Sequence, residues 1–170
     1  MSAEVKIPPK IESRAARPYA AIPVTAPMRE WGRVNALVPE VYGWLGQRRI
    51  APAGPLFYRY RVIGDMDAPF ELEVGVPVPE PVEGDGRVVP GSIPSGRYAV
   101  ATHHGHPDGL SGTITALREW AAEQGVTWDI RREGGTEVWG GCFEFYLTDP
   151  AVEPDLGKWS IDLAYRIQDA

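Results

Sequence analysis

Two stretches in which apolar and polar residues alternate constrain the fold of this chain most strongly. They are FELEVGVPV at residues 70–78 and WSIDLAYRI at residues 159–167. Successive side chains of a β-strand point to opposite faces, so each stretch predicts a strand with one apolar face. Such a face is stable only when other elements of the protein cover it.

The segments before these two strands follow the same order in each half of the chain. A strand-like segment leads into a helical stretch and then into another strand, with these strands expected at residues 18–24 and 54–62, and at 97–104 and 141–147. This order predicts two β-α-β-β units, at about residues 17–79 and 96–168, related by a pseudo-twofold axis. We therefore expect an α+β fold, with a mostly antiparallel sheet and two main helices packed on its alternating apolar faces.

Apolar residues spaced three and four apart predict the two helices. The first stripe consists of Trp31, Val34, Val38, Val41 and Leu45, and the second of Leu110, Ile114, Leu117 and Ala121. Pro39 interrupts the first stripe and should kink this helix or divide it into two pieces. Asp108 is the expected N-cap of the second helix, and Gly125 is its expected end. Residues 77–96, between the halves, are rich in Pro and Gly, which predicts an irregular connection.

Length and composition restrict the class of protein. A chain of 170 residues, 44% hydrophobic and 24% charged, is typical of one domain, expected here to span residues 1–170. The net charge of −6, with basic residues clustered only in pairs such as Arg48-Arg49, argues against direct contact with nucleic acid. No apolar stretch approaches the roughly 20 residues of a membrane span, and the N-terminus lacks a secretory signal, so we expect a cytoplasmic protein. The single Cys142 excludes a disulfide framework.

The strand at residues 141–147 carries a carboxylate among aromatic residues. Alternation places Glu144 on one face together with Tyr146, and the repeat aligns Tyr58 with Glu144 and Tyr60 with Tyr146. A pseudo-twofold arrangement would bring these four residues to one central surface, on the strand faces opposite those covered by the helices. From the pattern alone, a Glu144 that faces solvent is an equally good interpretation, and tyrosines commonly pack in strands without binding a ligand.

Several segments, taken in order, resemble one known family. They are GPLFYRY, SGRYAVATHHG, the Leu117 and Trp120 spacing, FEFYLTDP and WSIDLAYRI. From Tyr19 onward the chain resembles the GyrI-like small-molecule-binding domains, which also form the effector-binding half of multidrug-responsive transcription activators. The resemblance implies a duplicated βαββ unit with a ligand cleft along the pseudo-dyad and a buried glutamate at Glu144. Because only a short segment precedes the first strand, we expect a stand-alone member without the helix-turn-helix region of the regulators.

The resemblance implies two main functions for this surface. The first is multidrug-type binding of bulky aromatic or cationic apolar molecules, in which an ionised Glu144 and the rings of Tyr58, Tyr60 and Tyr146 hold the ligand. Alternatively, the chain is a hydrolase that opens cyclopropanoid DNA-alkylating compounds, with Glu144 as base and Tyr146 as hydrogen-bond donor. A further alternative is a gyrase-inhibitor-like module that contacts gyrase or another protein.

Other residues with chemical potential receive plainer interpretations. Trp31, Trp120 and Trp159 follow core periodicity and are expected to pack, which leaves Trp139 and Trp44 as candidate walls of the cleft. His103, His104 and His106 lie close together, but no further ligand follows at helical spacing, so we expect no metal. Cys142 is expected to be a small apolar strand residue. The sequence has no phosphate loop, dinucleotide fingerprint or serine-nucleophile motif, so we expect no cofactor.

Overall fold

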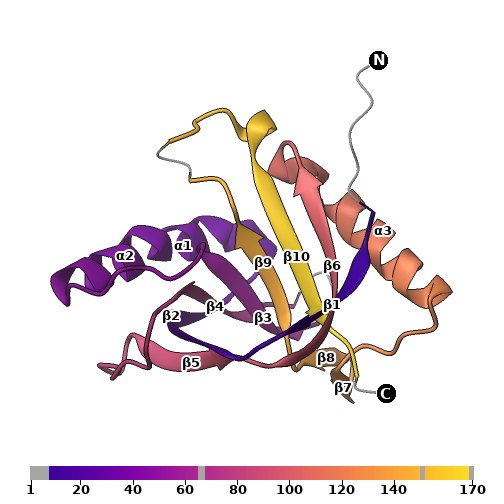
Figure 1. The fold of residues 1–170 in the computed structure, drawn as a ribbon, viewed down its shortest axis with the longest axis horizontal. Coiled ribbons are helices and arrows are strands. Elements are labelled where there is room, and N and C mark those ends of the chain that lie inside the picture. The colour runs from indigo at the N-terminus through magenta and orange to yellow at the C-terminus, as the bar shows by residue number, and fades with distance from the viewer. Residues whose placement is uncertain (1–7, 65–67, 150–151, 169–170) are drawn as a thin grey trace.

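The structure, a computed structural model, describes residues 8–64, 68–149 and 152–168. Within them, ten strands form one curled sheet in the order β1-β6-β10-β9-β3-β4-β2-β5, and the β7–β8 hairpin joins it through β3 (Figure 1). The strands are β1 (Lys10–Arg14), β2 (Arg17–Ala26), β3 (Phe57–Ile63), β4 (Phe70–Pro77), β5 (Val89–Ile93), β6 (Gly96–His104), β7 (Ile130–Glu133), β8 (Thr136–Trp139), β9 (Cys142–Tyr146) and β10 (Ser160–Arg166). The pairings between these strands are antiparallel. The predicted α+β class is therefore confirmed.

The strands predicted from alternation lie where the sequence placed them, as β2, β3, β4, β6, β9 and β10. Strand β3 from the first half of the chain and strand β9 from the second half are neighbours in the middle of the sheet. This order is compatible with two units related by a pseudo-twofold axis, although the duplication itself stays a prediction. One expectation was wrong: the Pro- and Gly-rich connection contains β5, which pairs with β2 at the sheet edge. An edge strand tolerates Pro90 because one side of it makes no ladder hydrogen bonds.

Helix α1 (Trp31–Asn35) and helix α2 (Leu37–Gln47) together cover the first apolar stripe. The predicted division into two pieces is present, but it lies at Ala36 rather than at Pro39. Pro39 has no N–H to donate to the carbonyl of Asn35, four residues earlier, so the ladder is interrupted one turn before the proline. Pro39 itself occupies the first turn of α2, where amide groups have no helical partner in any case.

Helix α3 (Leu110–Glu123) ends as predicted at Gly125, whose φ is +69°. The N–H of Gly125 donates to the Ala122 carbonyl (3.1 Å) and that of Val126 to the Ala121 carbonyl (3.2 Å), which is a Schellman ending. The predicted N-cap was wrong. Asp108 is exposed in a 3-10 turn, η2 (Pro107–Gly109), where its own N–H donates to the ring of His106, the N-cap of that turn. The residue before α3 is Gly109, which supplies no side-chain cap.

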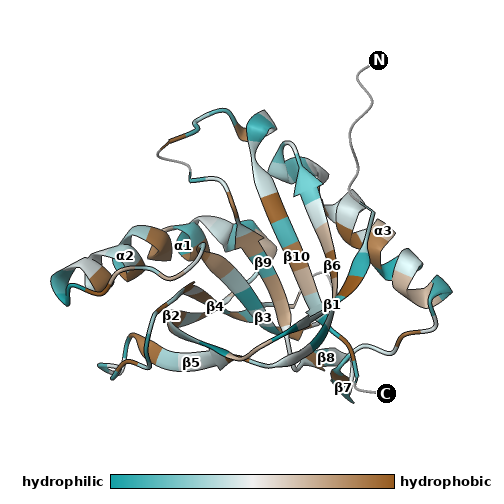
Figure 2. Ribbon diagram, in the orientation of Figure 1, coloured by the Kyte–Doolittle hydropathy of each residue, from teal (hydrophilic) through white to brown (hydrophobic). Residues whose placement is uncertain are grey.

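The helices cover one face of the curled sheet in two separate places (Figure 1). Helices α1 and α2 pack on β2 and β4, whereas α3 packs on β6 and β10. The alternation of hydropathy that fixes these faces is visible along β10 in Figure 2. Tyr60 and Tyr146 pack against the apolar cluster under α1 and α2 and also against the cluster under α3. These two tyrosines therefore lie at the centre of the sheet, between the two helical layers. Short turns η1 (Met28–Glu30) and η3 (Leu156–Lys158) complete the helical elements.

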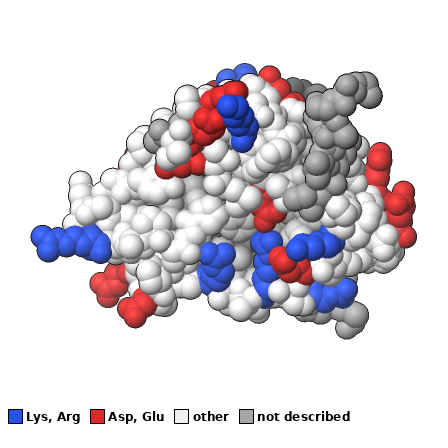
Figure 3. All heavy atoms as spheres, turned by 45° about the horizontal axis from the view of Figure 1, so that its top comes forward, with Lys and Arg blue, Asp and Glu red and all other residues white. Residues whose placement is uncertain are grey.

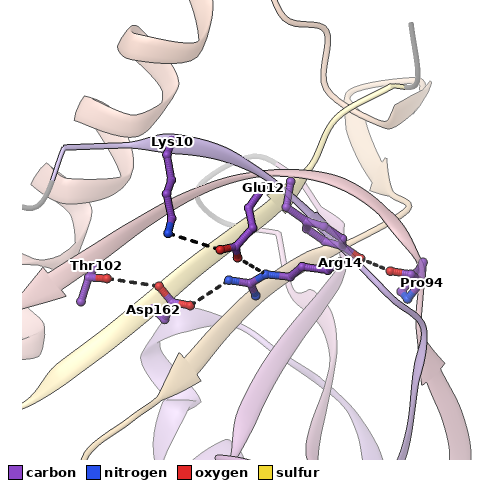
Figure 4. Close-up of polar contacts among 7 residues, drawn as sticks. Lys10, Glu12, Arg14, Pro94, Thr102 and Asp162 are labelled. Atoms are coloured by element: carbon purple, nitrogen blue, oxygen red, sulfur yellow. Dashed lines mark hydrogen bonds and ion pairs between the residues drawn. The ribbon is translucent and has the colours of Figure 1, made fainter.

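The opposite face of the sheet carries a network of charged residues (Figure 4). Arg14 of β1 donates to Glu12 (2.7 Å) and to Asp162 of β10 (3.2 Å). Its guanidinium lies 5.9 Å from the ring centroids of Tyr98 and Phe145. These contacts hold edge strand β1 across β6 and onto β10. No helix in the described part of the chain is long and apolar enough to cross a membrane.

Candidate functional site

Glu144 lies at the centre of the sheet, in the middle of β9. Its direct neighbours in the ladder are Tyr58 of β3 and Leu163 of β10. Only 4% of Glu144 is exposed. Two tyrosine hydroxyls donate to the same carboxylate oxygen, Oε1: that of Tyr60 at 3.0 Å and that of Tyr146 at 3.2 Å.

The surroundings of Glu144 favour its neutral form. Burial raises the pKa of this carboxyl to about 7, and the hydrogen bonds from Tyr60 and Tyr146 lower it only in part. Among the residues that the structure describes, no Lys, Arg or His acts on this carboxyl group as an ion-pair partner. A buried acid without a basic partner is costly for a protein to keep charged, and such groups are concentrated at functional sites.

Aromatic rings surround the carboxylate. Trp31 of α1 stacks on Tyr60 with ring centroids 6.1 Å apart, and it lies 6.2 Å from Tyr58. The ring of Tyr58 lies 5.1 Å from that of Tyr146. The hydroxyl of Tyr58 donates to the side chain of Asn35 at 2.6 Å, which fixes its ring against α1. Helix α1 and strands β3 and β9 thus form one aromatic wall.

This wall faces a pocket of about 570 Å³, here called the central pocket. The residues that line it are Trp31, Asn35, Val38, Pro39, Leu56, Tyr58, His106, Pro107, Asp108, Tyr146, Leu156 and Trp159. Tyr58 and Tyr146 present their rings to the pocket. Glu144 lies one layer deeper, hydrogen-bonded to the Tyr146 hydroxyl. A volume of this size is in the range of about 300–1,000 Å³ that is common for small-molecule sites.

The structure brings together the four residues that the sequence placed on a central surface, but on the other face of the sheet. Glu144 stands opposite Leu163, and Tyr58 stands opposite Val74. Directly opposed residues of antiparallel strands point to the same side, and Leu163 and Val74 belong to the alternating faces covered by the helices. The site therefore lies on the helix-bearing face, in the gap between the two helical layers.

The two predicted tryptophan walls lie elsewhere. Trp44 donates to Asp85 (3.0 Å), and the guanidinium of Arg48 lies 4.0 Å from its ring centroid. Trp139 is buried against Trp128 and Tyr165, with ring centroids 5.7 and 5.3 Å away. Neither side chain lines the central pocket.

Sequence reasoning assigned Trp31 and Trp159 to packing, and both line the pocket. It also missed Asn35. This polar residue stands four positions after Trp31, and side chains at that spacing share one side of a helix. In the sequence, the tryptophan and the amide on the same side of the helix were the signal that could have identified Asn35 as a pocket residue.

The histidines have structural partners. The His103 ring lies between the Thr113 hydroxyl (2.6 Å) and the His106 carbonyl (2.8 Å). No group of three or more His, Cys, Asp or Glu side chains in the described ranges is placed to hold a metal ion. Burial raises the pKa of the Cys142 thiol well above its usual value, which keeps the sulfur protonated and unreactive.

The family model of the GyrI-like small molecule binding domain matches residues 7–167. This chain belongs to that family. No curated protein matches the sequence.

Solved structures of other proteins show the same fold. The EcmrR C-terminal domain is 12% identical and superposes with a TM-score of 0.81, over 98% of this chain and 100% of that domain. In the cryo-EM structure of the EcmrR–DNA complex the match has a TM-score of 0.80 at 12% identity and covers 96% of this chain but only 58% of EcmrR.

Two further solved structures share the fold. SAV2435, solved with bound tetraphenylphosphonium, has a TM-score of 0.59 at 10% identity, over 95% of this chain and 94% of its own. A hydrolase encoded by lin2189 from Listeria innocua has a TM-score of 0.59 at 14% identity, over 94% and 91%. At such identities the likeness shows the fold alone.

Proposed function

We propose that this GyrI-like domain binds bulky aromatic molecules, cations above all, in the central pocket, and that Glu144 supplies the negative charge. The observation that carries the proposal is a carboxyl group that is only 4% exposed, bonded to two tyrosine hydroxyls and to no described basic group. A bound cation would supply the positive charge that the Glu144 carboxylate lacks. The rings of Trp31, Tyr58 and Tyr146 add cation–π attraction of about 0.5–2 kcal/mol each.

The charges around the central pocket favour cations over anions. In the described part of the chain, its lining contains Asp108 but no Lys or Arg. Two other surface hollows combine arginines with carboxylates: one has Arg48 and Arg49 beside Glu80 and Glu83, and another has Arg14 and Arg17 beside Glu12 and Asp162. On the face drawn in Figure 3, basic and acidic side chains are interspersed and leave broad uncharged areas. The central pocket thus differs from these two hollows, because no arginine is among its described lining residues and more aromatic side chains line it.

The test is a titration with tetraphenylphosphonium, followed through tryptophan fluorescence, because Trp31 and Trp159 line the pocket. Glu144→Gln keeps the shape and removes the charge, so we expect its affinity to fall at least about tenfold, or 1.4 kcal/mol. Glu119→Gln, on the exposed side of α3, is the control and should bind like the wild type. Equal affinities for all three proteins would refute the role of Glu144.

The titration also has a characteristic pH dependence. A bound cation stabilises ionised Glu144, so affinity should fall as the pH drops below about 7, the pKa of the free carboxyl. Binding near pH 7 should release protons. A neutral aromatic ligand of similar size should show neither effect.

A second function is favoured by the pKa of Glu144, because a base with a pKa of about 7 is well matched to proton transfer at neutral pH. In hydrolytic opening of a cyclopropane conjugated to a carbonyl, the oxygen of water bonds to a ring carbon and the ring C–C bond breaks. The electron pair moves to the carbonyl oxygen. Glu144 accepts the proton of water and returns it to that oxygen, to which Tyr146 donates a hydrogen bond.

Mass analysis separates the two functions. A cyclopropanoid incubated with the wild-type protein should gain the mass of one water if the chain is a hydrolase, and should be recovered unchanged if it only binds. A Glu144→Gln variant that converts the compound at the wild-type rate excludes Glu144 as the base. Gyrase inhibition remains a prediction of the resemblance, to be tested by capture of gyrase on the immobilised chain.

A further inference from the structure

A second hollow, here called the side chamber, adjoins the central pocket. It has a volume of about 390 Å³ and is lined by Val38, Pro39, Tyr42, Pro55, Leu56, Tyr146, Leu147, Thr148 and Asp149. Val38, Pro39, Leu56 and Tyr146 line both hollows. The two spaces therefore meet at a shared wall formed by the first turn of α2, the start of β3 and the end of β9.

The side chamber exposes large apolar side chains. Leu147 is 51% exposed and Tyr42 is 41% exposed, and Leu156, on the rim of the central pocket, is 36% exposed. A single exposed leucine is common on protein surfaces, but apolar side chains gathered around one concave site mark a place where an apolar partner binds. Apart from Tyr42, Thr148 and Asp149, the described residues that line the chamber are aliphatic, proline and Tyr146.

The charge of the side chamber matches that of the central pocket. Among the residues that the structure describes, its lining contains Asp149 but no Lys or Arg. Asp149 is close to Tyr42, since burial and, secondarily, the charge of Asp149 raise the pKa of the Tyr42 hydroxyl. An anionic tail is therefore disfavoured in the chamber, whereas an uncharged apolar one is accepted.

We propose that the two hollows act together and that the preferred ligands are elongated amphiphiles, with an aromatic cationic head and an apolar arm. The head occupies the central pocket, and the arm crosses the wall at Leu56 and Tyr146 into the side chamber, against Tyr42 and Leu147. This inference rests on the proposed function, because it takes the central pocket as the site of the head. It adds a determinant of specificity that Glu144 does not provide.

The probes are two alkyltriphenylphosphonium cations that share a head, one with a methyl arm and one with a hexyl arm. Each methylene that becomes buried raises affinity about fourfold at most, so a partly open chamber should give the hexyl compound at least about tenfold tighter binding. Leu147→Ser and Tyr42→Ser should remove most of this advantage and leave the affinity of the methyl compound unchanged. Both side chains are exposed, so the variants should fold.

Val152→Ser is the matched control, because Val152 is 79% exposed and lines neither hollow. It should retain the full hexyl advantage. If the methyl compound binds and the hexyl compound gains nothing, or gains equally in Leu147→Ser and the wild type, the side chamber holds no arm and this inference is wrong. If neither compound binds the wild type, the proposed function fails and the inference fails with it.

Discussion

At the scale of single residues, Glu144 couples the stability of the domain to pH. Its pKa is about 7 in the folded chain and 4.5 in an exposed glutamate, so the folded state binds more protons than the unfolded state between these values. The contribution of a group with a raised pKa is favourable at low pH and is lost as the pH rises. The free energy of unfolding should therefore fall by about 3 kcal/mol between pH 4.5 and pH 8 on account of this residue.

Urea unfolding of the wild type and of Glu144→Gln at pH 5 and pH 8 measures this contribution. The amide cannot ionise, so the variant should lack this loss and be the more stable protein at pH 8. The comparison between the two proteins removes the effect of every other titrating group. Parallel losses in both would show that Glu144 keeps an ordinary pKa.

The tyrosine hydroxyls around Glu144 have separable roles. Those of Tyr60 and Tyr146 donate to the carboxylate and lower its pKa, whereas that of Tyr58 donates to Asn35. Tyr60→Phe and Tyr146→Phe should therefore move the pH midpoint of tetraphenylphosphonium binding above its wild-type position. Tyr58→Phe is the control and should leave the midpoint in place. A midpoint that shifts as much in Tyr58→Phe would contradict these assignments.

At the scale of elements, the two longer helices end in the same way with different residues. Arg49, just after α2, has a φ of +57°, with its N–H donating to Gly46 (3.2 Å) and that of Ile50 to Leu45 (3.0 Å). Gly125 holds the equivalent position after α3, and no atom lies within 4 Å of a Cβ added there. Glycine adopts a positive φ without steric cost, while other residues do not.

Opposite substitutions at these two helix ends should have opposite effects. Arg49→Gly should stabilise the domain, and Gly125→Ala should destabilise it, each by about 1 kcal/mol. Thermal unfolding measures both changes. Because the added methyl at Gly125 meets no neighbour, a loss there reports backbone conformation alone, and the absence of any loss would contradict the Schellman ending.

At the scale of the whole molecule, buried Arg59 joins distant parts of the sheet. It donates to the Tyr19 hydroxyl of β2 (2.9 Å), to the Ser92 carbonyl of β5 (3.2 Å) and to the Gly140 carbonyl before β9 (3.0 Å). Its Nε has no partner among the described residues. This side chain therefore holds one face of the sheet together behind the site.

Arg59→Met should lower the free energy of unfolding by about 3 kcal/mol, because three acceptors lose their donor in a buried place. Arg131→Met is the control. Arg131 pairs with Glu133, and both side chains are more than half exposed (71% and 57%), so its loss should cost below about 1 kcal/mol. Denaturant unfolding of the two variants checks the difference, and equal losses would assign Arg59 no special role.

The sequence alone determined strands β2, β3, β4, β6, β9 and β10, the division of the first helix and the end of α3. It could do so because alternation, a missing proline N–H and a glycine at positive φ act within a few residues. It also grouped Tyr58, Tyr60, Glu144 and Tyr146. Only the tertiary structure decided which face of the sheet these residues occupy, since that depends on how β9 is registered against β10 and β3, which are distant in sequence. Tertiary packing also placed Trp31 and Asn35 at the pocket and Trp44 and Trp139 elsewhere. The periodicity of apolar residues predicts which side of an element faces the protein, but it does not predict which of those residues pack against another side chain and which line a pocket.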